Sequence, residues 1–181
     1  METIKDKEIK AFNLLKGDFD YKNIMQAPKI KKVIVSVGVG KIKDDKRKLK
    51  VIPEKLALIT GQKPSLRPAK KSIATFKVRE GQTSGFQVTL RGDRMYKFVD
   101  KLINVALPRT RDFRGIKLSG IDSMGNYSMG IKENTIFPET ADEDLNDVFG
   151  MSVTIVTSSN NKKETEAFLR HLGFPFKKDE E

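Results

Sequence analysis

Strict alternation of apolar and polar residues in two nearby segments constrains the fold of this chain more than any other feature. The apolar side chains are Ala74, Phe76 and Val78 in residues 74–79, and Phe86, Val88 and Leu90 in residues 86–91. Successive side chains of a strand point to opposite faces, so both segments predict strands with one apolar face. Residues 80–85 between them contain two glycines, which predicts a β-hairpin with a flexible tip. The polar face of this hairpin carries Lys77, Arg79, Gln87, Thr89 and Arg91.

Periodicity predicts further helices and strands on both sides of this hairpin. The expected helices cover 4–15 (ended by Gly17), 53–59 (opened by Pro53 and closed by Gly61), 93–106 (ended by Pro108) and a last segment capped by Asn161 with Glu164 and ended by Gly173; the expected strands cover 30–37 and 151–157. Interleaved helices and half-polar strands predict an α+β fold, with helices packed on one face of an antiparallel sheet and the other face partly open for binding. No repeat or composition break divides the chain, so residues 1–181 are expected to form a single domain.

Length and composition exclude several classes of protein. A chain of 181 residues is long enough to bury a substantial core. It has no cysteine, which excludes disulfides, thiolate metal sites and a cysteine nucleophile, and suits a reducing cytoplasm. The amino terminus is charged and no apolar run approaches the length of a membrane helix, so neither export nor a membrane span is expected.

Positive charge is concentrated in residues 61–115, which contain thirteen Lys and Arg against four Asp and Glu. This stretch holds most of the formal net charge of +11, in three pieces at 62–71, 89–94 and 107–115. A basic surface on ordered structure predicts a polyanionic partner, with nucleic acid first and an anionic membrane surface second. The membrane alternative requires a basic amphipathic helix or a polybasic tail, and the chain has neither.

RNA is a better candidate partner than DNA. The chain has no helix-turn-helix, zinc-finger or basic-zipper pattern, and a sheet face with hydroxyl and amide groups suits phosphates and 2′-hydroxyls. An RNA-recognition module is the main structural rival, because residues 79–86 are reminiscent of its signature. That module needs an exposed aromatic pair, whereas Phe86 falls on the apolar side of its strand. Docking on folded RNA is therefore favoured over the stacking of single-stranded bases.

Catalytic and metal-binding patterns are absent or incomplete. The one histidine, His171, lies near the end of the last expected helix, where an imidazole commonly interacts with the helix carbonyls. The acidic run at 139–147 lacks the spacing of a calcium loop, and residues 38–41 lack the spacing of a phosphate-binding loop. We therefore expect no enzyme activity, no metal and no cofactor. A free-standing RNA chaperone and an enzyme using carboxylates remain the alternatives to a structural RNA-binding protein.

Several long strings of this sequence resemble one protein family. They lie at 60–64, 69–72, 76–81, 88–96, 108–115 and 125–130, and include Thr-Leu-Arg-Gly-Asp-Arg-Met-Tyr and Pro-Arg-Thr-Arg-Asp-Phe-Arg-Gly. On these strings the chain resembles bacterial large-subunit ribosomal protein five, in register from about Tyr21 to Phe176. The resemblance implies a non-catalytic, cytoplasmic protein that is a monomer within the large ribosomal subunit. It further implies binding of 5S rRNA and large-subunit rRNA in the central protuberance, contact to P-site tRNA through the hairpin tip, and an intersubunit bridge to small-subunit protein thirteen.

The resemblance also assigns residues to each of these roles. The expected rRNA-binding residues are Ser36, Gln62, Lys63, Lys70, Lys71, Phe76, Thr89 and Arg91. The expected tRNA-contacting residues of the hairpin tip are Lys77, Arg79, Gln82, Thr83 and Ser84. The expected residues of the intersubunit bridge are Arg109, Arg111, Arg114, Asp142 and Glu143.

Ser36 and Phe76 fit the resemblance less well than the other positions. Ser36 stands where the family usually has asparagine, and one hydroxyl makes fewer hydrogen bonds than an amide. The alternation of the first predicted strand places Phe76 on the buried side, whereas the resemblance places it against RNA. Thr89 and Arg91 fall on the polar side by both arguments.

Overall fold

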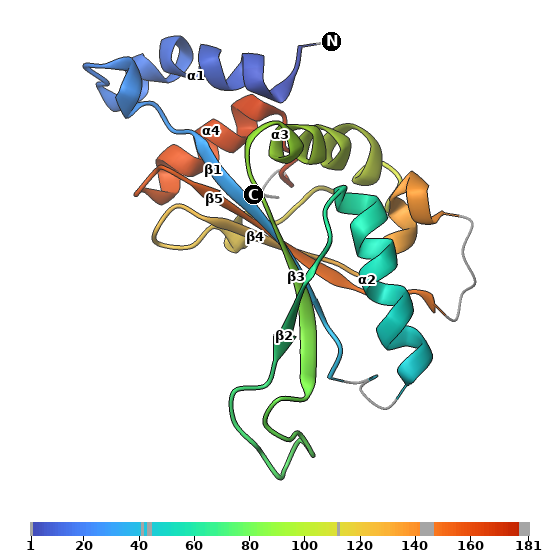
Figure 1. Ribbon diagram of the computed structural model, residues 1–181. Coiled ribbons are helices and arrows are strands. Elements are labelled where there is room, and N and C mark those ends of the chain that lie inside the picture. The colour runs from blue at the N-terminus through green and yellow to red at the C-terminus, as the bar shows by residue number, and fades with distance from the viewer. Residues whose placement is uncertain (1, 41, 43–44, 112, 142–146, 178–181) are drawn as a thin grey trace. The chain divides into compact units, whose positions relative to one another are not determined.

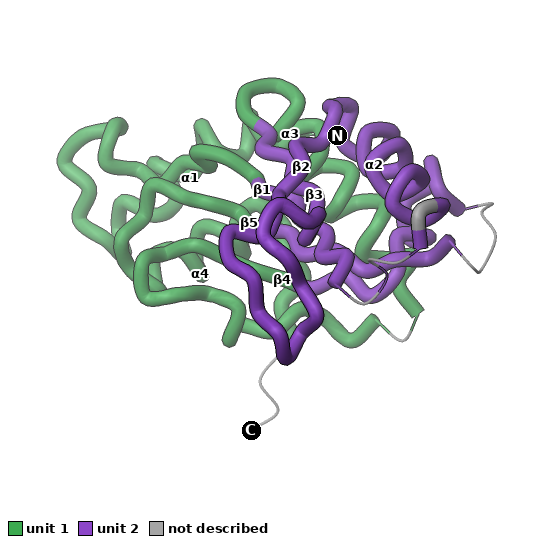
Figure 2. Tube along the Cα trace, turned by 60° about the horizontal axis from the view of Figure 1, so that its bottom comes forward, with its two compact units in different colours: residues 1–33, 91–129, 154–181 green, residues 34–90, 130–153 purple. Residues whose placement is uncertain are grey.

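The computed structural model describes residues 2–40, 42, 45–111, 113–141 and 147–177 (Figure 1). The chain groups into two compact units (Figure 2). Unit 1 contains Met1–Val33, Arg91–Met129 and Thr154–Glu181, and unit 2 contains Ile34–Leu90 and Gly130–Val153. In the described ranges, no helix is both long enough and apolar enough to cross a membrane.

The architecture is α+β, as predicted. The four α-helices are α1 (Ile4–Phe19), α2 (Lys46–Thr60), α3 (Gly92–Lys101) and α4 (Lys162–Leu172). The five strands are β1 (Ile30–Gly38), β2 (Ser65–Pro68), β3 (Thr83–Leu90), β4 (Tyr127–Ile131) and β5 (Met151–Thr157), and they form one sheet in the order β2-β3-β1-β5-β4.

Neighbouring strands of the sheet run antiparallel. β2 pairs antiparallel with β3. Between β1 and β5, the Ser36 and Ser152 hydroxyls lie 2.8 Å apart, and the Ser158 N–H donates to the Lys29 carbonyl over 2.9 Å. Residue 36 thus lies opposite residue 152 and residue 29 opposite residue 158, so β1 and β5 run in opposite directions, as in an antiparallel ladder.

Burial alternates along the central strands. In β1, Val33, Val35 and Val37 are buried, whereas Ile34 and Ser36 keep partial exposure. β5 alternates in the same way. One side of each strand therefore packs into the core, and the other side keeps some contact with solvent.

Helices α1, α3 and α4 pack together in unit 1. The Glu8 carboxylate on α1 accepts a hydrogen bond from the Tyr96 hydroxyl of α3 over 2.9 Å and another from the Ile30 N–H over 3.1 Å. The Tyr21 hydroxyl, which follows α1, donates to the Glu164 carboxylate of α4. Burial of each helix's apolar stripe, together with these bonds between elements, holds the helices in place.

Several predicted boundaries are confirmed by the structure. β5 has the predicted bounds, and α3 with the π-helical turn Leu102–Ala106 covers the predicted helix and ends before Pro108. Asn161 caps α4 by accepting the Lys163 N–H, and Gly173 ends the helix in the left-handed conformation. Glu164 does not complete a capping box as expected, because its carboxylate accepts hydrogen bonds from Tyr21 and Ser159 instead.

Two predictions about helix ends were wrong, and one strand was not predicted. α2 begins at Lys46 and not at Pro53, because the Asp45 carboxylate caps an earlier first turn by accepting the N–H groups of residues 47 and 48. α1 continues through Gly17 to Phe19 and ends at Asp20. β4 was not anticipated, because it has only five residues and one of them is Gly130, a residue type that is uncommon in strands.

The predicted hairpin has a different first strand. Residues 65–68 pair with β3, and residues 74–79 do not form a strand. In that segment the Lys77 N–H donates to the Ala74 carbonyl over 2.9 Å, and the backbone of Lys77 has a φ of 50°. A tight turn with a left-handed residue cannot extend as a strand, so residues 74–79 belong to the loop that joins β2 and β3.

Candidate nucleic-acid interface

The structure brings Gln62 and Thr89 together in unit 2. Gln62 directly follows Gly61, the left-handed residue that ends α2, and Thr89 lies on β3 between buried Val88 and Leu90. The side-chain amide of Gln62 donates a hydrogen bond to the backbone carbonyl of Thr89 over 3.3 Å. Both side chains keep partial exposure, so the Gln62 amide, held at the backbone of Thr89, and the Thr89 hydroxyl are each partly accessible.

Ser36 lies on the partly exposed side of β1. Its hydroxyl is 2.8 Å from that of Ser152 on β5, and either oxygen can donate this hydrogen bond. Ser152 was not predicted as a site residue. The alternation in 151–157 already placed it on the polar side of its strand, but only the pairing of β1 with β5 places it beside Ser36.

The loop 69–82 between β2 and β3 is held by its own backbone. The Ala69 N–H donates to the Gln82 carbonyl over 2.8 Å, and the Gly81 N–H donates back to the Ala69 carbonyl over 3.0 Å. The Gln82 side chain accepts the Arg79 N–H over 3.2 Å. These bonds order the loop in the absence of a ligand, which lowers the conformational entropy lost when it binds one.

Phe76 lies in the tight turn at the end of this loop, and its side chain is 69% exposed. The alternation that placed Phe76 on a buried face was wrong, because the turn that begins at Ala74 replaces the predicted strand. An exposed aromatic ring is costly in water and can stack on a base.

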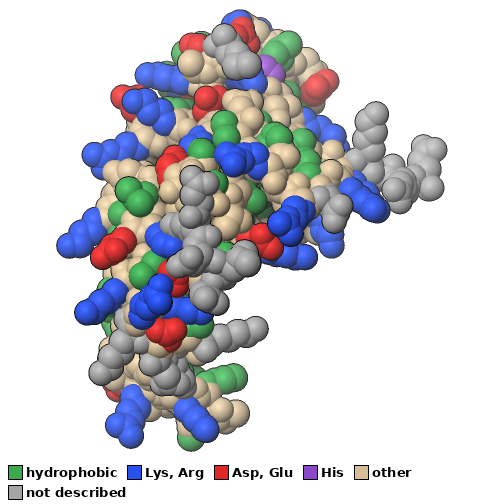
Figure 3. All heavy atoms as spheres, turned by 90° about the vertical axis from the view of Figure 1, so that its right-hand side faces the viewer, with side chains coloured by type: hydrophobic (Ala, Val, Ile, Leu, Met, Phe, Trp, Pro, Cys, Tyr) green, Lys and Arg blue, Asp and Glu red, His purple; other side chains and the backbone are tan. Residues whose placement is uncertain are grey.

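The hairpin loop and the segment before β2 carry exposed cations. Lys63, Lys70, Lys71, Lys77 and Arg79 are all exposed; of the other predicted tip residues, Ser84 is exposed and Gln82 and Thr83 are partly exposed. Figure 1 shows the hairpin at the lower end of the view, and Figure 3 shows Lys and Arg side chains projecting at that end. The loop therefore carries both positive charge and hydrogen-bonding groups on its surface.

The remaining predicted residues lie in unit 1 or outside the described ranges. Arg91 is exposed at the first position before α3, and Arg109, Arg111 and Arg114 are exposed in the segment that follows Pro108. Asp142 and Glu143 lie outside the described residues. Asp147, from the same acidic run, is mostly buried, and its carboxylate forms an ion pair with the guanidinium of Arg47 on α2, 3.5 Å away.

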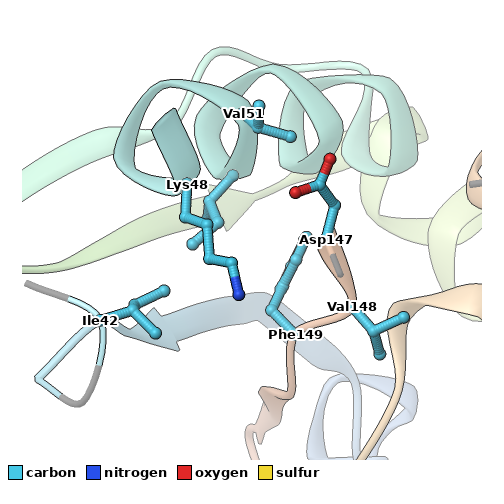
Figure 4. A pocket seen from close by; sticks show the side chains of 7 residues that line it. Ile42, Lys48, Val51, Asp147, Val148 and Phe149 are labelled. Atoms are coloured by element: carbon cyan, nitrogen blue, oxygen red, sulfur yellow. The ribbon is translucent and has the colours of Figure 1, made fainter. Parts of the chain in front are cut away.

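Neither a hollow in unit 2 nor the histidine points to catalysis. Figure 4 shows the hollow, which has a volume of about 30 Å³. Its lining residues are Ile42, Lys48, Val51, Ile52, Asp147, Val148 and Phe149. This volume suits one or two water molecules rather than a substrate. The ring of His171 lies 2.8 Å from the Lys7 carbonyl, which is a structural contact between α4 and α1. Among the described residues, no three carboxylate or imidazole side chains gather as metal ligands.

Comparison with known proteins covers almost the whole chain. Residues 23–79 match the family model described as ribosomal protein L5, and residues 83–176 match the model described as the C-terminus of the same ribosomal family. A protein of Acholeplasma laidlawii (strain PG-8A) named large ribosomal subunit protein uL5 is 50% identical over 164 residues, 91% of each chain. A protein of the same name from Clostridium perfringens (strain SM101 / Type A) is 52% identical over 87% of this chain and 88% of that protein. Another, from Alkaliphilus metalliredigens (strain QYMF), is 45% identical over 98% of this chain and 100% of that protein.

Proposed function

Because this chain belongs to the ribosomal protein L5 family, we propose that it binds 5S rRNA and helps attach it in the central protuberance of the large ribosomal subunit. The chain is a structural constituent of the large subunit and not an enzyme. The observation that carries the proposal is the partly exposed polar side of unit 2, where the Gln62 amide is fixed beside Thr89 and the Ser36 hydroxyl beside Ser152.

The chemistry of this surface suits a folded RNA. Hydroxyls and a side-chain amide can bond phosphates, 2′-hydroxyls and base edges in the wide minor groove of an RNA helix. Lys63, Lys70 and Lys71 are exposed beyond the ends of α2 and β2, where they can neutralise phosphates. Phe76 adds a stacking platform for an unpaired base. Arg91 is the member of this set that lies in unit 1. We expect contacts to the neighbouring large-subunit rRNA as well.

The hairpin loop is proposed to contact P-site tRNA. Lys77 and Arg79 supply charge for a phosphate backbone, and Gln82, Thr83 and Ser84 supply hydrogen-bonding groups. A tRNA must be released at every elongation cycle, which favours a contact with few apolar groups. The internal hydrogen bonds of the loop keep its shape between one tRNA and the next.

The arginine-rich segment is proposed to form the intersubunit bridge to small-subunit protein thirteen. Arg109, Arg111 and Arg114 are exposed, and Asp142 and Glu143 supply the opposite charge. Charges of both signs favour a contact that re-forms easily while the subunits move. No cofactor or metal is needed for any of these roles, and one copy of the chain suffices.

A binding experiment tests the 5S rRNA assignment. The full-length protein is titrated against 5S rRNA and against an unrelated RNA hairpin at the same salt concentrations. We expect preference for 5S rRNA, and a slope of log K against log salt of about −5 if about six phosphates are contacted. Equal affinity for the two RNAs would favour a general RNA chaperone instead.

Two variants test the proposed surface in the same assay. Thr89→Val removes a hydroxyl from β3, and Arg91→Ala removes a charge at the start of α3, so both are expected to weaken 5S rRNA binding. Lys163→Ala is the control, because Lys163 is an exposed cation on α4 without a proposed contact. Equal effects of all three variants would show that the surface is not the binding site.

A further inference from the structure

The register of the hairpin places Arg67 on the polar face of unit 2. Leu66 of β2 lies opposite buried Phe86 of β3, whereas Arg67 lies opposite Gly85. Directly paired residues of an antiparallel ladder point to the same face. Phe86 points into the core, so the next residue pair, Arg67 and Gly85, points to the opposite face, the one that also carries Thr89.

The residue paired with Arg67 is a glycine, so β3 adds no side chain beside Arg67. Gly85 carries no side chain, and a Cβ atom at this position would lie only 2.5 Å from the Val37 carbonyl oxygen and 3.5 Å from the Gly38 Cα. The close approach of β3 to β1 therefore requires glycine here.

Arg67 also lacks an internal partner. Its side chain is exposed, and it makes no hydrogen bond or ion pair with any residue in the described part of the chain. Its guanidinium can therefore offer all of its N–H donors to a ligand, and two parallel hydrogen bonds to a phosphate are its preferred geometry.

We infer that Arg67 binds a backbone phosphate of 5S rRNA docked on the polar face of unit 2. This inference rests on the proposed function, and it gives a role to Arg67, which the sequence pattern placed only within the basic piece 62–71 and the family resemblance did not single out. The neutral groups of Gln62, Thr89 and Ser36 can position an RNA on this face but cannot neutralise it. Arg67 supplies the charge that they lack.

The test uses the full-length protein and 5S rRNA over a range of salt concentrations. Arg67→Gln removes the charge from an exposed position, so melting temperature is expected to stay unchanged. One lost phosphate contact makes the slope of log K against log salt shallower by about 0.9 and weakens binding about five- to tenfold at about 0.1 M salt. Arg67→Lys keeps the charge and is expected to retain the slope.

Lys50→Gln is the matched control, because it makes the same change of charge at an exposed position of α2 in the same unit. Its slope is expected to equal that of the wild type. Equal slopes for Arg67→Gln and Lys50→Gln would overturn the inference while leaving 5S rRNA binding intact. A wild-type protein that does not prefer 5S rRNA would overturn the proposed function as well.

Discussion

The side-chain amide of Gln62 donates to the backbone carbonyl of Thr89 over 3.3 Å, across 27 residues of sequence. This bond joins the segment after α2 to the end of β3. It also fixes the orientation of the amide, because only the nitrogen can donate to a carbonyl. The oxygen and the second N–H of Gln62 remain for a partner.

Gln62→Ala is therefore expected to affect binding more than stability. The variant loses one partly exposed hydrogen bond, which costs about 1 kcal/mol of unfolding free energy. Loss of the positioned amide is expected to weaken 5S rRNA binding about tenfold, equivalent to about 1.4 kcal/mol. Urea denaturation and RNA titration measure the two effects. Asn13→Ala, an exposed change on α1, is the control; a Gln62→Ala protein with wild-type affinity would contradict this role.

Phe76→Leu is likewise expected to weaken RNA binding while leaving the stability of the fold nearly unchanged. The ring is 69% exposed, so its replacement should leave the melting temperature nearly unchanged. Loss of a base-stacking partner is expected to cost about 1–3 kcal/mol of RNA binding. The reverse result is expected for Phe168→Leu, since Phe168 is fully buried in unit 1 and its replacement costs about 1 kcal/mol of stability. A lowered melting temperature for Phe76→Leu with unchanged RNA affinity would assign the ring a structural role.

Local features of this fold could be predicted from the sequence, and the pairing of distant segments could not. The bounds of β5 and the cap at Asn161 depend on neighbouring residues and were correct. The prediction of the first hairpin strand was wrong because apolar and polar residues alternate in 74–79 just as they do in a true strand. The left-handed backbone of Lys77 makes residues 74–79 a turn, and residues 65–68 pair with β3 in their place. Periodicity reveals neither of these facts.

The same distinction between local and long-range information applies to the residues of the candidate site. The alternation of β3 correctly placed Thr89 on the polar side of its strand. It could not place Ser152 beside Ser36, because that contact joins residues 116 positions apart. Arg67 was missed for a related reason, since it belongs to the strand that the predicted hairpin left out.

Asp20→Gly is expected to stabilise the protein. Asp20 ends α1 with a φ of 50°, a left-handed conformation that costs an ordinary residue about 1 kcal/mol and costs glycine little. The variant should raise the melting temperature by a few degrees in thermal denaturation followed by circular dichroism. Asp18→Gly, inside the same helix, is the control and should lower it slightly. Equal shifts for the two variants would refute the conformational explanation.

Alkaline pH is expected to destabilise unit 1 through Tyr96. Burial, together with the hydrogen bond to Glu8, raises the pKa of Tyr96 to about 12 from 10.0. The unfolded chain loses this proton near its ordinary pKa and the folded chain near pH 12. The stability that Tyr96 contributes is therefore complete below pH 10 and is lost as the pH rises to 12.

Tyr96→Phe tests this dependence. The variant should be less stable by about 1–2 kcal/mol at neutral pH, because a hydrogen bond to a carboxylate is lost. Its unfolding free energy should then fall less steeply than that of the wild type when urea denaturation is repeated between pH 10 and 12. Parallel curves over that interval would rule out ionisation of Tyr96 as the cause.

The hydroxyls of Ser36 and Ser152 share one hydrogen bond before any ligand arrives. Only one of the two oxygens donates this bond, so the other hydroxyl keeps its proton for a partner, and both oxygens keep free lone pairs. A docking group can therefore bond to the pair without separating it. Because the two side chains already hold each other in place, less rotational freedom is lost when a partner arrives.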